Sequence, residues 1–350
     1  MANSDKQVPR VVVITGGTMG IGRATAGAFA REGWSVAILA RGETRLRSTE
    51  TEIKALGARV LGISCDVTDA AAVEAAASLI EDELGPIGAW VNNAMATVLA
   101  PATSITPLDY RRVTEVTYLG QVFGTLAALK LMKPRDRGVI VQVSSGLAVR
   151  AAPLQSAYCG AKSAVGGFTD SLRTELIHDR SRVRLVTIYL PAVNTPQFRR
   201  ARNYTGAGQN APDPVFDPRA CATAIVAAVS KPQREIWVGR STMQMAAIQA
   251  LAPSIGDSKA AKMWDAQLDH SISPASPGNL YDVDEDDPGI DGPFSSRTKR
   301  PGKEFVTSRS RNTVTAALIV ASLFSTCAIL APLVLALGAR SCRAVGQRTG

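Results

Sequence analysis

Three side chains in the middle of the chain have the types and spacing of a proton-transfer site. Tyr158 and Lys162 are four residues apart, and Ser145 precedes the tyrosine by thirteen residues. An apolar run before Ser145 and a helix-compatible stretch after it predict that Ser145 lies at a strand end and that Tyr158 and Lys162 share one helix face. An ammonium near a phenol favours phenolate and lowers a pKa that is otherwise about 10. The set could therefore exchange a proton with an alcohol or carbonyl near neutral pH, with Ser145 holding the reacting oxygen.

A glycine-rich turn near the N-terminus is the second feature with chemical meaning. Residues 10–15 form an apolar, β-branched run, Gly16, Gly20 and Gly22 follow, and an alanine-rich helical stretch comes after them. In this context Gly16 permits a tight turn, Gly20 lets the backbone approach a pyrophosphate, and Gly22 lets the helix pack closely on the strand. The helix N-terminus then favours the phosphates. A glycine-rich turn without a ligand is the alternative reading.

The end of the next strand-like run, residues 34–40, bears on the choice of dinucleotide. An acidic residue at this point would hydrogen-bond the ribose 2′-hydroxyl and repel a 2′-phosphate. This chain has Ala40 followed by Arg41, and a guanidinium is suited to binding a phosphate. The sequence therefore favours NADP(H) over NAD(H), with a merely solvated Arg41 as the alternative.

Four blocks in order resemble the short-chain dehydrogenase/reductase family over about residues 8–240. The blocks are Thr15-Gly-x-x-x-Gly-x-Gly22, Asn92-Asn93-Ala94, Ser145 with Tyr158-x-x-x-Lys162, and Pro191-Ala-Val-Asn-Thr195. The resemblance implies that Tyr158 is the general acid/base, that Lys162 binds the nicotinamide ribose and lowers the tyrosine pKa, and that Ser145 orients the substrate oxygen. It also implies a homo-oligomer.

Further cofactor contacts follow from the same resemblance. Asp66 looks like the acid that bonds the adenine amine, with Val67 beside the ring, although a helix-cap role for Asp66 is the rival reading. Thr195 would bond the nicotinamide carboxamide. The full expected set of cofactor-binding residues is Gly16, Thr18, Met19, Gly20, Ile21, Gly22, Arg41, Asp66, Val67, Asn92, Ala94, Tyr158, Lys162, Val193 and Thr195.

Three residues depart from the family pattern. Met95 and Ala192 each replace a glycine, the first near the cofactor and the second in the loop entering the substrate site. Thr117 stands where many relatives have an Asn that supports a water in the proton relay from the catalytic Lys. A threonine hydroxyl could still hold a water, so Thr117 is counted with the catalytic residues and the relay is expected to be modified.

Strand-like and helix-like runs alternate along the chain, which predicts an α/β fold: a Rossmann-type, doubly wound parallel sheet of about seven strands with helices on both faces. The expected strands are 10–15, 34–40, 59–64, 87–92, 138–144, 183–190 and 235–238. The expected helices are 20–32, 43–56, 69–84, 107–132, 156–179 and 217–230. Residues 192–216, rich in Pro, Gly, Asn and Arg, lie where a lid over the substrate would lie.

The C-terminal part has a different character and divides the chain into four regions. Residues 1–270 are the expected catalytic domain, 271–312 a flexible charged linker, 313–339 a transmembrane helix, and 340–350 a short basic tail. The linker could lie partly on the core through Leu280, Tyr281 and Phe294. The span is long enough to cross a bilayer, with a buried oligomerisation helix as the alternative. Basic residues before it favour a cytoplasmic catalytic domain.

Composition excludes several other functions. The net charge of +9 has much of its surplus beside the span, and no aromatic-rich basic platform appears, so DNA and RNA are discounted. The five cysteines have no metal-ligand spacing, and no metal is expected. The sequence thus predicts a membrane-tethered NADP(H)-dependent alcohol dehydrogenase or carbonyl reductase for a lipophilic substrate. A nucleotide-binding sensor or scaffold that has lost turnover is the alternative, motivated by Thr117 and Met95.

Overall fold

The computed structural model describes residues 10–274, 277–283, 286–299 and 305–307. The chain divides between Phe305 and Val306 into two compact units, and the fold below is that of the first. Of the second unit only Val306 and Thr307 are described, as the end of the short strand β15 (Phe305–Thr307).

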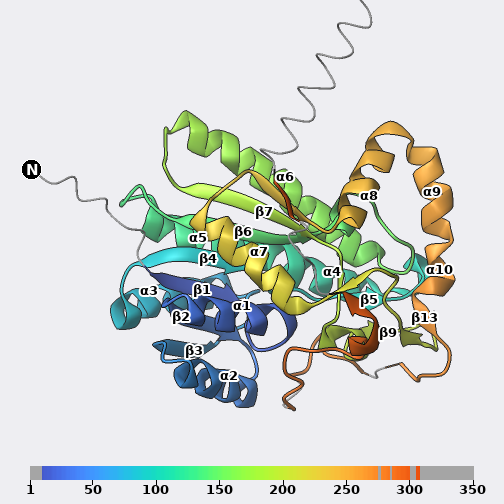
Figure 1. The fold of residues 1–350 in the computed structure, drawn as a ribbon, viewed down its shortest axis with the longest axis horizontal. Helices are drawn as coiled ribbons and strands as arrows, with labels where there is room; N and C mark the ends of the chain where they lie inside the picture. Colours follow the sequence, from blue (N-terminus) through green and yellow to red (C-terminus); the bar gives the residue numbers. More distant parts are fainter. Residues whose placement is uncertain (1–9, 275–276, 284–285, 300–304, 308–350) are drawn as a thin grey trace, which may run out of the picture. The chain divides into compact units, whose positions relative to one another are not determined.

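A parallel sheet forms the centre of the first unit (Figure 1). Seven of its strands follow the order β12-β7-β6-β4-β1-β2-β3. Their bounds are β1 (Val11–Thr15), β2 (Ser35–Ala40), β3 (Val60–Ser64), β4 (Ile87–Asn92), β6 (Val139–Ser145), β7 (Arg184–Leu190) and β12 (Glu235–Val238). The chain proceeds outward in one direction from β1 to β3 and then returns to place β4 on the other side of β1. Such a switch point opens a crevice at the carboxyl ends of the strands, where ligands bind in open α/β sheets.

Alternation along the strands sends apolar side chains to both faces. In β1, Val12 and Ile14 belong to one core cluster and Val11 and Val13 to the other. All five residues of this strand are buried, as expected when helices cover both sides of a parallel sheet. The strands therefore read as short, continuous apolar runs in the sequence, because both of their faces are covered.

Helices complete the two outer layers. Those on the first face are α1 (Gly20–Arg31), α2 (Glu43–Ala55) and α7 (Pro218–Ser230), and those on the second are α3 (Ala70–Leu84), α5 (Gly120–Met132) and α6 (Ser156–His178). The predicted helix 107–132 is divided into α4 (Pro107–Thr114), a π-helical turn (Glu115–Leu119) and α5. Apart from this division, the seven predicted strands and six predicted helices all form, and the Rossmann-type fold is confirmed.

The segment between β7 and α7, where a lid was expected, contains only short elements. They are β8 (Ala192–Val193), a 3-10 turn (Pro196–Arg199), β9 (Arg202–Asn203), β10 (Gly208–Gln209) and β11 (Val215–Phe216). β9 pairs with β5 (Val98–Leu99) and β10 with β13 (Leu268–Asp269), so the segment is tied to the neighbouring loops. A lid role for this segment stays a prediction.

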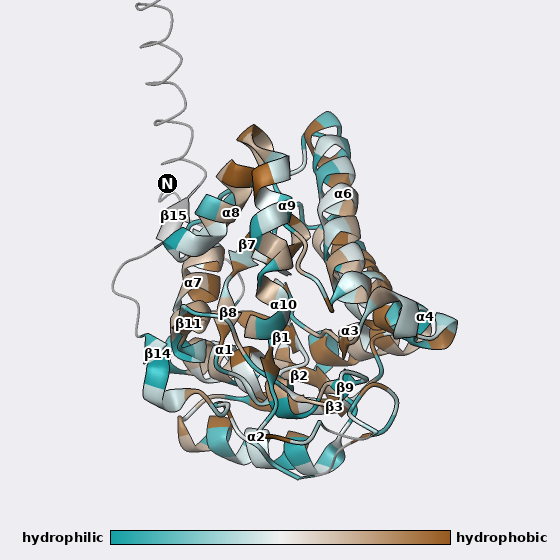
Figure 2. Cartoon of the chain, turned by 90° about the vertical axis from the view of Figure 1, so that its right-hand side faces the viewer, coloured by the Kyte–Doolittle hydropathy of each residue, from teal (hydrophilic) through white to brown (hydrophobic). Residues whose placement is uncertain are grey.

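Beyond β12 the chain forms a helical arm that the sequence did not predict. It consists of α8 (Arg240–Leu251), α9 (Pro253–Ala261) and α10 (Met263–Ala266). Leu251 is 85% exposed and Ile255 is 58% exposed, and brown, apolar residues are visible on the outside of α8 and α9 in Figure 2. The arm has little apolar periodicity because it packs only lightly on the rest of the unit.

The described residues from 277 to 299 differ from the predicted flexible linker. Leu280 is 1% exposed and Phe294 is 6% exposed, so both are anchored in the core as the sequence suggested. Tyr281 is half exposed, and its hydroxyl donates to Asp109 at 3.0 Å. The first compact unit therefore extends past residue 270 to Phe305, and it includes a further 3-10 turn (Ser295–Arg297) and β14 (Thr298–Lys299).

No helix in the described ranges is both long and apolar enough to cross a bilayer. The predicted transmembrane segment 313–339 and the basic tail 340–350 lie outside the described residues.

Candidate active site

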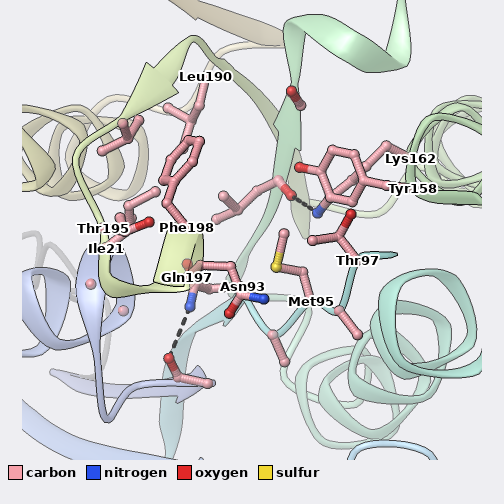
Figure 3. A pocket seen from close by; sticks show the side chains of 18 of the residues that line it. Ile21, Asn93, Met95, Thr97, Tyr158, Lys162, Leu190, Thr195, Gln197 and Phe198 are labelled. Atoms are coloured by element: carbon pink, nitrogen blue, oxygen red, sulfur yellow. Dashed lines mark hydrogen bonds between the residues drawn. The ribbon is translucent and has the colours of Figure 1, made fainter. Parts of the chain in front are cut away.

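The expected proton-transfer residues come together at the carboxyl end of the sheet. Ser145 is the last residue of β6, and Tyr158 and Lys162 lie one turn apart near the start of α6. All three are buried, with Lys162 only 2% exposed. The Lys162 ammonium nitrogen is 5.9 Å from the centroid of the Tyr158 ring, and Figure 3 shows both side chains at the wall of one cavity. The predicted helix-face arrangement is confirmed.

The acidity of Tyr158 is not what the sequence predicted. Burial raises the pKa of Tyr158, and a hydrogen bond with Ser145 opposes that rise only in part. Removing a phenolate from water costs more than this one hydrogen bond returns, so the pKa moves in the direction opposite to the lowering that the sequence predicts. Tyr158 is therefore a protonated phenol at neutral pH, which is the form that can donate a proton to a carbonyl oxygen.

Lys162 is the charge that was expected to act on the tyrosine. Burial lowers the pKa of Lys162 to about 7. Its nitrogen donates to the Val143 carbonyl at 2.6 Å, and this neutral partner does not replace the lost hydration of an ammonium. A lysine that titrates near neutrality can both take up and release a proton there.

Ser145 is oriented by the chain that follows it. Its hydroxyl oxygen accepts from the Leu147 amide at 3.1 Å, which leaves the hydroxyl proton to be donated toward Tyr158. The tight 3-10 turn Gly146–Ala148 after β6 provides this amide. Ser145 is thus held where it can share a hydrogen bond with the tyrosine and with an oxygen placed beside it.

The Thr117 hydroxyl is bonded to the backbone of a neighbouring loop, and its relay role stays a prediction. Its hydroxyl accepts from the Ala96 amide at 2.9 Å and donates to the Ala96 carbonyl at 2.9 Å. The side chain is fully buried and does not line the cavity. Because its one proton is already donated to a backbone oxygen, the hydroxyl is not available to hold a relay water by donation. Thr117 instead joins the π-helical turn to the loop after β4.

The glycine turn between β1 and α1 has the close backbone approaches that the sequence predicted. Gly16 has φ of 66°, a conformation that L side chains rarely adopt. A Cβ added to Gly22 would lie 2.1 Å from the Gly16 carbonyl oxygen, so helix and strand could not pack this closely with any side chain there. Met19, at the N-cap of α1, makes no side-chain cap, and the first residues of the helix, Gly20 to Gly22, line the cavity.

Cationic side chains lie at the end of β2, where an acid would select NAD. Arg41 and Arg45 both line the cavity. Arg41 donates to the backbone carbonyls of Asn279 at 2.9 Å and Tyr281 at 2.7 Å. The local charge at this corner is therefore positive and is suited to a phosphate more than to a bare ribose.

Asp66 lines the cavity as expected, but its carboxylate is already hydrogen-bonded to other residues of the chain. Its carboxylate accepts from the Arg112 guanidinium at 2.6 Å and from the amide and hydroxyl of Thr68 at 3.0 and 2.9 Å. Burial raises the pKa of Asp66, but these hydrogen bonds outweigh it and hold the pKa below its usual value. The rival helix-cap reading is wrong, because Asp69 accepts from Ala72 and caps α3.

Asn92 is the second predicted site residue that the structure removes from the cavity. It is fully buried, accepts from the Trp90 indole at 2.8 Å and donates to Thr125 and Gln142. Asn93 lines the cavity in its place, and its amide group donates to the Thr15 and Gly16 carbonyls at 3.1 and 3.0 Å. The strand extends to Asn92, so the side chain there points into the sheet's helical cover and the next one faces the glycine turn.

One cavity of about 380 Å³ connects the site. It is lined by every predicted catalytic and cofactor residue except Asn92 and Thr117, and by the departures Met95 and Ala192. Further apolar residues line it as well: Leu147, Ala152, Phe198, Met245 and Met263. The sequence pattern had not placed the last two, because they belong to the helical arm and carry no motif.

Three comparisons with known proteins bear on the family and fold of this chain. The family model described as short chain dehydrogenase matches residues 10–205. The chain is 29% identical to the oxidoreductase YxnA of Bacillus subtilis over 90% of this chain and 88% of that protein. It is 32% identical to the oxidoreductase SadH of Mycobacterium tuberculosis over 71% of this chain and 92% of that protein.

A solved structure of an alcohol dehydrogenase from Thermococcus sibiricus, complexed with 5-hydroxy-NADP, has the same fold. It superposes with a TM-score of 0.55 at 24% identity and covers 65% of this chain and 95% of that chain. With the family match over more than half of its length, this chain belongs to the short-chain dehydrogenase family and is an oxidoreductase of that type.

Proposed function

We propose that the chain is an NADP(H)-dependent oxidoreductase that interconverts an apolar carbonyl compound and its alcohol. The observation that carries this proposal is the single cavity that joins Ser145, Tyr158 and Lys162 to the glycine turn and Arg41. Proton chemistry and dinucleotide recognition are thereby brought to one crevice at the switch point of the sheet.

The residues present fit the cofactor. The uncapped N-terminus of α1 offers amides to a diphosphate, and Arg41 and Arg45 offer charge to a 2′-phosphate. When bound, the nicotinamide supplies the hydride that reduces the carbonyl carbon. The solved neighbour complexed with 5-hydroxy-NADP is consistent with this choice of dinucleotide.

The side chains of the chain supply the proton. The Ser145 hydroxyl and the Tyr158 phenol together hold the carbonyl oxygen, and Tyr158 donates its proton as charge develops there. Lys162, whose pKa is lowered to about 7 by burial, can then return a proton to the tyrosine near neutrality.

The cavity also bears on the substrate. Met95, Leu147, Phe198, Met245 and Met263 present apolar surface around the reacting end. Methionine side chains adapt to irregular shapes, so a bulky, flexible hydrocarbon skeleton suits this wall. We therefore propose lipophilic ketones or aldehydes as the substrate class.

Oxidation of NADPH in the presence of a panel of hydrophobic ketones tests the function. Wild type should consume NADPH with at least one of them, and Tyr158→Phe should bind NADPH equally well but turn over more slowly by a factor of about 10² to 10⁴. Tight binding without turnover on any ketone would instead support a nucleotide-binding sensor.

Arg41→Ala tests the 2′-phosphate assignment separately. The variant should lose affinity for NADPH relative to NADH by at least about tenfold, since only NADPH carries the phosphate. An equal loss for both dinucleotides would overturn the assignment.

We also propose, from sequence alone, that residues 313–339 anchor the enzyme in a membrane with the catalytic unit on the cytoplasmic side. The stretch carries no charged residue, and its length suffices to span a bilayer. Carbonate extraction of membranes should retain the full chain in the pellet and release a chain ending at Thr307; release of both would contradict the anchor.

The homo-oligomer stays a prediction, and size-exclusion chromatography with light scattering would test it.

A further inference from the structure

A C-terminal segment crosses the side of the cavity where the dinucleotide phosphates are expected. We call residues 277–283 and 286–299 the strap; they lie outside residues 10–205 that match the family model. The orange strap runs beside α1 and α2 in Figure 1. Two of its residues, Asn279 and Leu280, line the cavity itself.

The strap occupies a donor at the N-terminus of α1. The Gly20 amide donates to the Gly289 carbonyl at 3.1 Å. An amide has one proton, so a carbonyl oxygen and a phosphate oxygen cannot both accept it at full strength. The Gly289 oxygen therefore stands where the helix end would otherwise receive an anion.

The strap also occupies the guanidinium expected to bind the 2′-phosphate. The Arg41 side chain donates to the carbonyls of Asn279 and Tyr281, with a longer contact of 3.4 Å to that of Asp282. These carbonyl oxygens carry partial negative charge and accept from the same guanidinium that is expected to bind a phosphate. Both predicted phosphate-binding donors are thus satisfied by one segment of the chain.

Asn279 joins the two rims of the cavity. Its side chain exchanges hydrogen bonds with Gln197 at 3.3 and 3.1 Å, and its carbonyl accepts from Arg41. Gln197 follows Thr195, the residue expected at the nicotinamide, so the strap spans the cavity from the 2′-phosphate corner to the nicotinamide side.

One carboxylate fixes the strap's turn over the glycine loop. Asp287 pairs with Arg23 of α1 and accepts from the Ser48 hydroxyl of α2. The same carboxylate accepts from the Gly289 amide at 3.1 Å, which sets the carbonyl of that residue toward Gly20. Asp287 is therefore the anchor on which the contact to the α1 N-terminus depends.

We propose that the strap is a competing occupant of the phosphate sites, so that binding of the dinucleotide displaces Asn279, Tyr281 and Asp282 from Arg41 and displaces Gly289 from Gly20. This inference rests on the proposed NADP(H)-dependent function. If only molecules with an open strap bind the cofactor, the apparent dissociation constant equals the intrinsic one divided by the fraction of molecules that are open. The strap then sets both the affinity for NADP(H) and the rate of its exchange.

Asp287→Ala weakens the anchor and leaves the catalytic residues unchanged. Arg23 keeps its second partner, Glu52, at 2.7 Å, so the variant does not bury an unpaired charge. Asp179→Ala is the control, because it also removes a carboxylate that is paired with a cation, and its partners Lys133 and His178 lie outside the strap.

The experiment measures NADPH affinity by fluorescence titration and strap exposure by hydrogen exchange in the full chain. Asp287→Ala should bind NADPH about tenfold more tightly than wild type, since the closed state loses charge-assisted hydrogen bonds, while Asp179→Ala should match wild type. In wild type, saturating NADPH should speed exchange of the Gly289 amide.

Unchanged or weaker binding by Asp287→Ala, or protection of the Gly289 amide by NADPH, would overturn the competition. The strap would then cover the bound cofactor and not compete with it. If neither wild type nor Asp287→Ala binds NADPH or NADH, the proposed function itself fails.

Discussion

Replacing Lys162 by methionine should stabilise the fold near neutral pH while removing activity. Burial lowers the pKa of Lys162 from 10.5 to about 7, so between these values the unfolded chain binds one proton more than the folded chain. The cost of keeping this lysine buried is full below pH 7 and disappears above about pH 10.5. Methionine of similar length carries no such cost.

The magnitude follows from the slope of that linkage. One proton corresponds to about 1.4 kcal/mol per pH unit in the free energy of unfolding. The stability advantage of Lys162→Met over wild type should therefore shrink by about 2 kcal/mol between pH 7 and pH 9. Urea unfolding followed by circular dichroism at pH 7, 8 and 9 measures it directly.

Lys133→Met provides the control for this measurement. Lys133 is exposed, and a hydrogen bond with Asp179 raises its pKa, so it stays charged in both states throughout this pH range. Its stability difference from wild type should be constant from pH 7 to pH 9. A constant difference for Lys162→Met as well would refute the assignment of a buried lysine that titrates near neutrality.

Two further substitutions test other parts of the site. Thr117→Val should lower the free energy of unfolding by about 1 to 3 kcal/mol in urea titrations, because it leaves a buried amide and carbonyl unpaired; a wild-type stability with reduced turnover would restore the relay role. Gly22→Ala should weaken NADPH binding at least about tenfold in fluorescence titrations, because its methyl would meet a backbone oxygen at 2.1 Å. Gly166→Ala, whose methyl would meet nothing within 4 Å, should instead stabilise α6 by about 0.5 to 1 kcal/mol; equal effects of the two glycine changes would contradict the close-packed turn.

The elements of the sheet could be predicted because their signals are local. A strand buried on both faces needs a short apolar run, and all five residues of the run at Val11–Thr15 are buried in β1. The glycine turn could be predicted for the same reason, since Gly16 and Gly22 are each required by a contact within the turn. Spacing alone also placed Tyr158 and Lys162 on one side of α6.

The errors at the site come from effects that spacing does not contain. Asn92 and Asn93 are adjacent, and one residue of difference in the strand's end decides which of them faces the cavity. The direction of the Tyr158 pKa depends on how completely the folded chain excludes water, which no motif records. The family resemblance suggests a relay role for Thr117, but its hydroxyl is bonded to the backbone of Ala96, which lies in another loop.

The order of the strap could not be predicted from its own residues. Its composition is polar and acidic, which favoured a flexible linker. Its stability comes from partners far away in the sequence, such as Arg23 for Asp287 and Asp109 for Tyr281. Charges that look solvated in a sequence can be paired once the fold brings the opposite charges beside them.

A crystal structure of the full chain with NADP⁺ tests the central claim most directly. The account predicts a nicotinamide ring that faces the Tyr158 hydroxyl across a space for one carbonyl group, with reacting atoms about 3 to 3.5 Å apart once a ketone is present. It also predicts a 2′-phosphate at Arg41. A dinucleotide bound elsewhere, or with its nicotinamide turned away from Tyr158 and Ser145, would contradict the account.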